Sequence, residues 1–166
     1  GSTLGVGSTF TITIPFEIAE SVEEKSTRRN DAGQADIRGL HLMLAEDNDL
    51  NAEIAKMLLE DAGVIVTVVG DGQQAVSLFQ EKPAGTFDVI LMDIMMPVMD
   101  GLTATKTIRA LDRPDARTIP IIAMTANAFE EDAKKCLAAG MNAHLVKPLD
   151  IGKLIATIAQ YKTKEK

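Results

Sequence analysis

The sequence has a single cysteine, Cys136, and no tryptophan among its 166 residues. One cysteine excludes an internal disulfide and a thiolate cluster for zinc or for iron and sulfur. No stretch reaches the roughly 18 consecutive apolar residues of a membrane span. The N-terminus lacks the basic and apolar regions of an export signal. These absences predict a cytoplasmic domain without redox chemistry and without direct membrane contact.

The sequence also has fewer basic residues than acidic ones. Lys and Arg total 17 against 24 Asp and Glu, which gives a formal net charge of −7. A negative molecule repels the phosphate backbone of nucleic acids. Aromatic residues make up only 4% of the chain, too few for stacking on exposed bases. We therefore expect no direct contact with nucleic acid. The hydrophobic content of 46% is that of a globular domain with one core.

Composition divides the chain into four segments: 1–18, 19–38, 39–162 and 163–166. In the first segment, polar and apolar residues alternate from Thr9 to Ile14, which predicts one strand. The second is rich in charge and lacks apolar periodicity, which predicts a flexible linker. The third is expected to be the main domain, and the fourth a short tail.

The main segment alternates short apolar runs with amphipathic stretches, a pattern typical of βα units and hence of a parallel sheet. The runs lack internal alternation, which indicates strands buried on both faces. They are Leu40–Ala45, Val64–Val69, Phe87–Met92, Ile119–Met124 and Ala143–Val146. Helices are expected where Leu50, Ile54 and Leu58 recur at four-residue spacing, and at 73–80, 102–111, 133–140 and 151–158. We predict a flavodoxin-like doubly wound α/β fold with five parallel strands in the order 2-1-3-4-5 and five helices.

Chemically useful side chains stand where four of these runs end. The first run ends in Glu46 and Asp47, and the third in Asp93. The fourth ends in Thr125 and the fifth in Lys147. Because open parallel sheets bring the carboxyl ends of their strands to one crevice, we expect these five side chains to converge.

Three carboxylates in one crevice need a cation, because each pair at about 4 Å costs about 4 kcal/mol at an effective dielectric near 20. Oxygen ligands without His or Cys favour a hard divalent ion, and Mg²⁺ suits a few carboxylates together with water and phosphate oxygens. Lys147 adds a positive charge, and the Thr125 hydroxyl a hydrogen-bond donor for a phosphate oxygen. Asp93 is then the predicted nucleophile, which forms an acyl phosphate.

Residues 40–161 resemble the receiver domain family of two-component signalling. The motifs that carry the resemblance are LAEDN at 44–48, LMDIMMPVMDG at 91–101, AMTA at 123–126 and KPL at 147–149. The resemblance implies that Asp93 accepts a phosphoryl group from a phosphohistidine on a histidine kinase or a histidine phosphotransfer protein. It also implies that the backbone carbonyl of Met95 joins the three acids as an Mg²⁺ ligand, and that the Lys147–Pro148 peptide bond is cis.

In the family, the hydroxyl at Thr125 turns toward the phosphate and an aromatic side chain on the last strand follows it inward. The matching position holds His144, a departure that would make the movement sensitive to pH. The resemblance further implies that Met95 and Asn127 tune the rate of hydrolysis. Phosphorylation would be read out on the surface formed by the fourth helix, fifth strand and fifth helix.

The first 18 residues resemble the last strand of a histidine kinase ATP-binding domain, through the stretch Leu4–Phe10 and the alternation after it. This second resemblance implies a hybrid histidine kinase as the parent protein, with any membrane anchor outside this segment. On its own, the receiver would catalyse only its own phosphorylation and dephosphorylation, so whether it counts as an enzyme is open.

Three alternatives remain. A phosphohydrolase with an aspartyl nucleophile usually has a second acid two residues after the nucleophile, where this chain has Met95. A flavin-binding protein of the same fold requires a loop rich in Ser and Thr after the first strand, where Glu46-Asp47-Asn48 stands. A receiver that binds its partner without phosphorylation is the third, and the full set of five site residues disfavours it.

Overall fold

The computed structural model describes residues 2–3, 7–8, 37–126 and 129–162. The chain divides into two units, 1–33 and 34–166. In the first unit, β1 (Ser2–Thr3) pairs antiparallel with β2 (Gly7–Ser8), a pairing that the sequence analysis did not predict. The strand predicted at Thr9–Ile14, the tail and nearly all of the predicted linker lie outside the described residues.

The second unit is a five-stranded parallel sheet in the order β4-β3-β5-β6-β7. Numbered along this unit, the order is 2-1-3-4-5, so the predicted flavodoxin-like fold is confirmed. The strands are β3 (His41–Ala45), β4 (Ile65–Val69), β5 (Val89–Asp93), β6 (Ile121–Thr125) and β7 (Ala143–Val146). The helices are α1 (Asp49–Asp61), α2 (Gly72–Glu81), α3 (Gly101–Ala110), α4 (Glu130–Ala139) and α5 (Ile151–Lys162).

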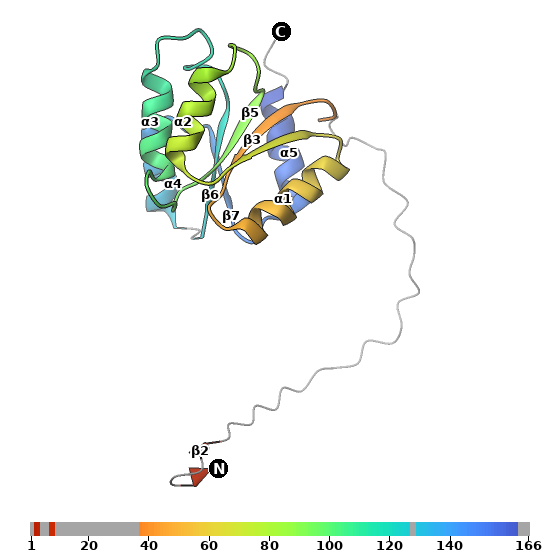
Figure 1. Ribbon diagram of the computed structural model, residues 1–166, viewed down its shortest axis with the longest axis vertical. Coiled ribbons are helices and arrows are strands. Elements are labelled where there is room, and N and C mark those ends of the chain that lie inside the picture. Colours follow the sequence, from red (N-terminus) through yellow and green to blue (C-terminus); the bar gives the residue numbers. More distant parts are fainter. Residues whose placement is uncertain (1, 4–6, 9–36, 127–128, 163–166) are drawn as a thin grey trace. The chain divides into compact units, whose positions relative to one another are not determined.

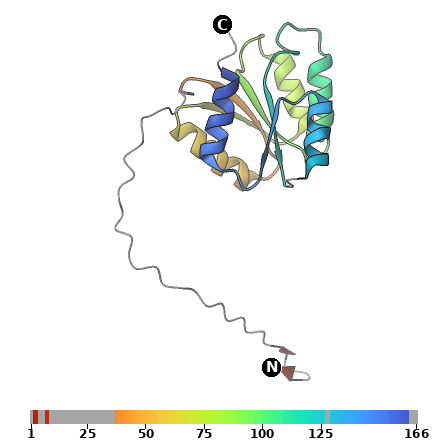
Figure 2. The ribbon, with the colours of Figure 1, turned by 180° about the vertical axis from the view of Figure 1, so that it is seen from behind.

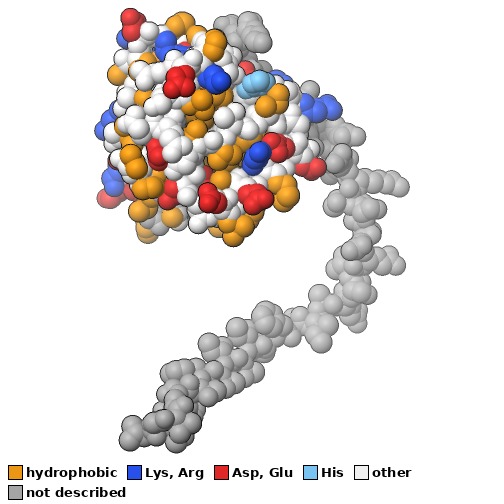
Figure 3. All heavy atoms as spheres, viewed as in Figure 1, with side chains coloured by type: hydrophobic (Ala, Val, Ile, Leu, Met, Phe, Trp, Pro, Cys, Tyr) orange, Lys and Arg blue, Asp and Glu red, His pale blue; other side chains and the backbone are white. Residues whose placement is uncertain are grey.

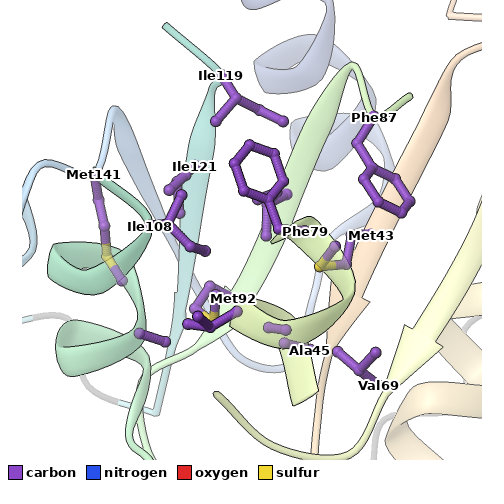
Figure 4. Close-up of a cluster of buried hydrophobic side chains, with 14 of the residues drawn as sticks. Met43, Ala45, Val69, Phe79, Phe87, Met92, Ile108, Ile119, Ile121 and Met141 are labelled. Atoms are coloured by element: carbon purple, nitrogen blue, oxygen red, sulfur yellow. The ribbon is translucent and has the colours of Figure 1, made fainter. Parts of the chain in front are cut away.

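The helices cover both faces of the sheet. Helices α1 and α5 lie on one side and α2, α3 and α4 on the other, as the two opposite views show (Figures 1 and 2). Each face has its own buried cluster. Phe79, Met92 and Ile108 belong to the cluster under α2, α3 and α4 (Figure 4), whereas Leu44 and Ile158 belong to the cluster under α1 and α5. None of the helices in the described ranges combines the length and the hydropathy that a membrane span requires.

The two outer strands differ from the prediction. Strands β3, β5 and β6 are buried nearly throughout, as their uninterrupted apolar runs indicate. Strands β4 and β7 form the sheet edges, where Ile65, Val68 and Val146 are exposed. An apolar run does not distinguish an edge strand from a central one, because the position in the sheet is decided by pairing between distant segments.

Helix α1 packs on a side different from the one its most obvious repeat suggests. Ala52, Ala55 and Leu59 are the residues that it buries against the sheet. The larger side chains of Leu50 and Ile54 are exposed. The contact thus consists of two small residues and Leu59, while the bulky side chains of Leu50, Ile54 and Met57 are exposed.

Three helices that start at the carboxyl edge of the sheet have polar N-caps, which satisfy backbone N–H groups that the first helical turn leaves open. The caps each accept a hydrogen bond from the backbone three residues later: Asn48 from Asn51 at 3.0 Å, Asp71 from Gln74 at 2.8 Å and Asp100 from Thr103 at 2.8 Å. These caps fix the loops that follow β3, β4 and β5, where the predicted site lies.

Candidate functional site

Strand register brings the predicted site residues to one level of the sheet. Ala45 on β3 is opposite Met92 on β5, so that Glu46 follows beside Asp93. On the other side of β5, Asp93 is opposite Met124 on β6. The backbone N–H of Lys147 donates to the Thr125 carbonyl at 2.8 Å, which ties the end of β7 to the end of β6.

Lys147 lies between two of the acids. Its ammonium nitrogen is 2.5 Å from a carboxylate oxygen of Glu46 and 2.5 Å from one of Asp93. Burial lowers the pKa of Lys147, but hydrogen bonds to Asp93 and Glu46 outweigh that effect, so the pKa is raised above its usual value. The lysine therefore stays charged at neutral pH and bridges strands β3, β5 and β7 across the site.

The third acid completes a cluster suited to a metal ion. One carboxylate oxygen each from Glu46, Asp47 and Asp93 can be chosen so that all three lie within 4.8 Å of one another. Glu46 and Asp93 are buried, whereas Asp47 is exposed. Three carboxylates and one ammonium leave two uncompensated negative charges, which a divalent cation balances. The donors are all carboxylate oxygens, and such a set fits Mg²⁺.

The loop after Asp93 folds back onto the strand that carries it. The backbone N–H of Met95 donates to a carboxylate oxygen of Asp93 at 3.1 Å, while the Met95 side chain is exposed. The N–H of Gly101 donates to the Ile94 carbonyl at 3.0 Å. A Cβ at Gly101 would lie 2.1 Å from the backbone oxygen of Asp93, so this close approach requires glycine.

The remaining predicted residues that the structure describes lie at or near the same edge. Thr125 is buried at the end of β6, and the Lys147–Pro148 peptide bond is cis, the conformation that the resemblance implied. His144 is exposed on β7, opposite Ala123 and two residues before the level of Thr125. Asn127, the second predicted tuning position, lies outside the described residues.

Sequence reasoning missed one residue that contacts this cluster. The side-chain nitrogen of Asn51, in the first turn of α1, donates to Glu46 at 3.2 Å. The sequence does contain a signal for this contact, because Asn51 lies in the first helical turn after the acidic pair and is therefore near Glu46. Its amide alone gave no reason to prefer it over Asn48, which caps the same helix.

Comparison with known families identifies the class of protein. Residues 42–159 match the model of the response regulator receiver domain. The chain belongs to this family, whose members take part in two-component phosphorelay signalling. The relatives include Histidine kinase 1 of Arabidopsis thaliana, 37% identical over 155 residues, which cover 75% of this chain and 13% of that protein. Hybrid signal transduction histidine kinase B of Dictyostelium discoideum is 40% identical over 117 residues, which cover 65% of this chain and 6% of that protein.

Solved structures agree with this assignment. The receiver domain of the sensor histidine kinase PA1611 from Pseudomonas aeruginosa PAO1 was solved with a magnesium ion coordinated in its active-site cleft. It is 40% identical, with a TM-score of 0.67 and coverage of 75% of this chain and 98% of that one. The receiver domain of Ssk1 from Saccharomyces cerevisiae was solved with the histidine phosphotransfer protein Ypd1. It is 27% identical, with a TM-score of 0.65 and coverage of 74% and 88%.

The chain spans between 6% and 18% of the length of eight of the curated relatives that it matches. Seven of these eight relatives are named as histidine kinases, two of them as hybrid, and the eighth as a sensor kinase/phosphatase. The match therefore concerns a part of each protein and not its whole activity.

Proposed function

We propose that Asp93 accepts a phosphoryl group from a phosphohistidine of a partner protein, with Mg²⁺ bound beside it. The observation that carries this proposal is the position of Lys147, 2.5 Å from a carboxylate oxygen of both Glu46 and Asp93. Asp93 thus contacts a fixed positive charge and belongs to an acidic cluster suited to a divalent cation. Phosphoryl transfer to a carboxylate needs both, because the nucleophile and the incoming group are negatively charged.

In the proposed reaction, a carboxylate oxygen of Asp93 forms a bond to phosphorus while the P–N bond to the donor imidazole breaks. The electron pair of that bond leaves on the imidazole nitrogen. Lys147 and the hydroxyl of Thr125 bind phosphoryl oxygens. Water later attacks the acyl phosphate and releases inorganic phosphate, which returns Asp93 to its carboxylate form.

The metal site of this proposal consists of Glu46, Asp47 and Asp93 with the backbone carbonyl of Met95. When bound, Mg²⁺ neutralises charge on the phosphoryl oxygens and on the acids. The fit rests on the three carboxylates within 4.8 Å and on the charge balance of the site. The PA1611 receiver, at 40% identity, holds magnesium in its cleft, which supports the same ion here.

The exposed stripe of α1 is the proposed docking face for the phosphodonor, a helical histidine phosphotransfer domain. We define the α1 stripe as Leu50, Ile54 and Met57, which are 65%, 46% and 62% exposed. Figure 3 shows hydrophobic side chains at the surface of this region, interspersed with acidic ones. Because α1 begins at Asp49, two residues after Asp47, a partner seated on the stripe lies next to the acidic cluster. The Ypd1–Ssk1 complex shows that a receiver of this fold binds such a protein.

Phosphorylation is proposed to act through Thr125 and His144. The Thr125 hydroxyl would turn toward the phosphoryl group, and the ring of His144 would move toward the space it leaves. The surface of α4, β7 and α5 would report the change. Phe129 and Leu137 on this surface are exposed apolar side chains, available for a partner that recognises one of the two states.

We place this receiver in a hybrid histidine kinase, where residues 1–18 would end the ATP-binding domain. In support, the relatives include Probable histidine kinase 1 of Oryza sativa subsp. indica, at 33% identity, and two hybrid signal transduction histidine kinases of Dictyostelium discoideum. The cytoplasmic location, the absence of nucleic acid contact and the boundaries of segments 19–38 and 39–162 stay predictions.

The proposal is tested by incubating the protein with Mg²⁺ and acetyl phosphate and measuring the intact mass. We expect the parent to gain one phosphoryl group, and Asp93→Ala to gain none. Asp112→Asn, at an exposed loop position, is the matched control and should behave as the parent. Chelation of Mg²⁺ should abolish the gain. Labelling of Asp93→Ala would contradict Asp93 as acceptor, and release of many phosphates per chain each second would favour a phosphohydrolase.

A further inference from the structure

Glu46 is held from two directions. Its Oε2 accepts a hydrogen bond from Lys147 at 2.5 Å. Its Oε1 accepts a second hydrogen bond, at 3.2 Å, from the side-chain amide of Asn51. The lysine follows β7, whereas Asn51 belongs to α1, so the buried carboxylate is attached to two elements that come from distant parts of the sequence. Two donors on opposite oxygens fix the plane of the carboxylate as well as its position.

We propose that Asn51 is a positioning residue, which holds Glu46 so that its carboxylate stays available to the metal ion. This inference rests on the proposed function, in which Glu46, Asp47 and Asp93 bind Mg²⁺. Among the described residues, Lys147 is the other hydrogen-bond partner of the Glu46 carboxylate, so without the amide its attraction draws the group toward Asp93. Hydrogen bonds to a carboxylate that binds a metal ion commonly control metal affinity in this way.

Asn51 is well placed for this role because its backbone is fixed. Its N–H donates to the side-chain oxygen of the N-cap Asn48 at 3.0 Å, so the amide projects from an anchored helical turn. A short side chain on an anchored turn reaches Glu46 with little conformational freedom to lose on binding.

The amide of Asn51 is also neutral, which suits this position. A lysine or arginine at position 51 would place another cation next to the cluster and compete with Mg²⁺. An aspartate would repel Glu46. A neutral donor orients the carboxylate without changing the two uncompensated negative charges of the site.

The test measures Mg²⁺ binding directly, without a phosphodonor, by following amide NMR shifts of the whole chain during a titration with MgCl₂. Asn51→Ala removes the amide, and Asn51→Leu keeps a similar volume without a donor. Gln80→Ala, at an exposed position near the end of α2, is the matched control for loss of an amide on a helix surface.

We expect both Asn51 variants to need about 3- to 10-fold more Mg²⁺ for half saturation. This change is smaller than the roughly 10- to 100-fold loss of metal affinity that is typical when a residue hydrogen-bonded to a metal ligand is replaced, because Asn51 is partly solvated. In phosphorylation by acetyl phosphate, the Mg²⁺ concentration for half-maximal rate should rise by the same factor, while the rate at saturating Mg²⁺ stays within about twofold of the parent. A structural role alone would lower the thermal midpoint and leave Mg²⁺ affinity unchanged.

If both variants reached half saturation at the same Mg²⁺ concentration as the parent, the assignment of Asn51 would be overturned. So would an equal weakening in Gln80→Ala. Failure of the underlying function gives a different result, since the parent itself would then show no saturable Mg²⁺ shifts around Asp93 and no phosphoryl gain.

Discussion

Lys147 donates a hydrogen bond to Asp93 across 2.5 Å, although 54 positions separate the two residues in the sequence. The same ammonium group contacts Glu46. One lysine thus neutralises part of the charge of an acidic cluster. In the proposed reaction, the same ammonium group also binds an incoming phosphoryl oxygen. We therefore expect Lys147 to weaken Mg²⁺ binding and to speed phosphoryl transfer.

Lys147→Met is expected to separate these two roles. Loss of the cation removes a repulsion between the lysine and Mg²⁺, so Mg²⁺ should bind several-fold tighter in an NMR titration. Loss of a donor to the phosphoryl oxygens should slow phosphorylation by acetyl phosphate about 100-fold, the lower bound for removal of one charge-stabilising donor. Weaker Mg²⁺ binding in Lys147→Met would contradict this account of the site.

Ile54→Lys tests the α1 stripe as the docking face. The exposed position predicts little change in folding, and phosphorylation by acetyl phosphate should match that of the parent because the small donor needs no docking. Transfer from a phosphorylated histidine phosphotransfer protein should fall at least about 10-fold, as expected for a central apolar contact. Gln80→Lys carries the same charge on another helix, and an equal loss in that variant would contradict the assignment of α1.

Val98→Asn should stabilise the loop that follows Asp93. Val98 has a φ of 64°, a left-handed conformation that is unfavourable for a β-branched residue and well tolerated by asparagine. The side chain is 85% exposed, so little buried area is lost. We expect the free energy of unfolding, measured in urea, to rise by about 1 kcal/mol. Val146→Asn, on extended backbone in β7, should instead lower it, and stabilisation by both changes would contradict backbone strain as the cause.

Arg109→Lys should destabilise the domain although the charge is kept. The guanidinium donates to the carbonyls of Gly140 and Ala116 and to the side chain of Asn142, at 2.9, 2.8 and 2.9 Å. A lysine ammonium cannot reproduce this planar arrangement of donors. We expect a loss of about 2 kcal/mol in urea unfolding, from carbonyls left without a partner. Arg117→Lys, at an exposed position, should stay within about 0.5 kcal/mol of the parent.

Asp115 should contribute stability that depends on pH. The hydrogen bond from Arg113 lowers the pKa of Asp115, burial opposes this, and the backbone N–H of Gly85 lowers it further. Because the folded-state pKa is below the unfolded value of about 3.9, the contribution is complete well above that value and is lost as the pH falls through the folded-state pKa.

The measurement is urea unfolding of Asp115→Asn and the parent across a pH series. We expect the variant to be less stable by about 1 kcal/mol at neutral pH, the ordinary value for a hydrogen bond, and the difference to shrink below about pH 4. A difference that is constant with pH, or that grows in acid, would contradict the sign of the shift. Asp112→Asn serves as the exposed control.

Much of the fold was predictable because the local pattern and the global arrangement agree. The uninterrupted apolar runs at β3, β5 and β6 indicated buried strands, and these are the central strands of the sheet. The same pattern at β4 and β7 gave the strands correctly but their burial wrongly, since exposed Ile65 and Val146 look like core residues in a sequence. In α1, the repeat of large apolar residues suggests the wrong buried face, because Ala52 and Ala55 are among the residues that contact the sheet.

The sequence by itself determined which chemical groups stand at the ends of the strands, because residues such as Asp93 and Lys147 directly follow apolar runs that form a parallel sheet in one topology. Only the tertiary structure decided which oxygen of Glu46 meets Lys147 and which meets Asn51, and which side of α1 faces solvent. Those contacts depend on strand register and on the rotation of each helix about its axis. The same hydrophobic pattern allows several registers and rotations, so the sequence alone does not fix the contacts.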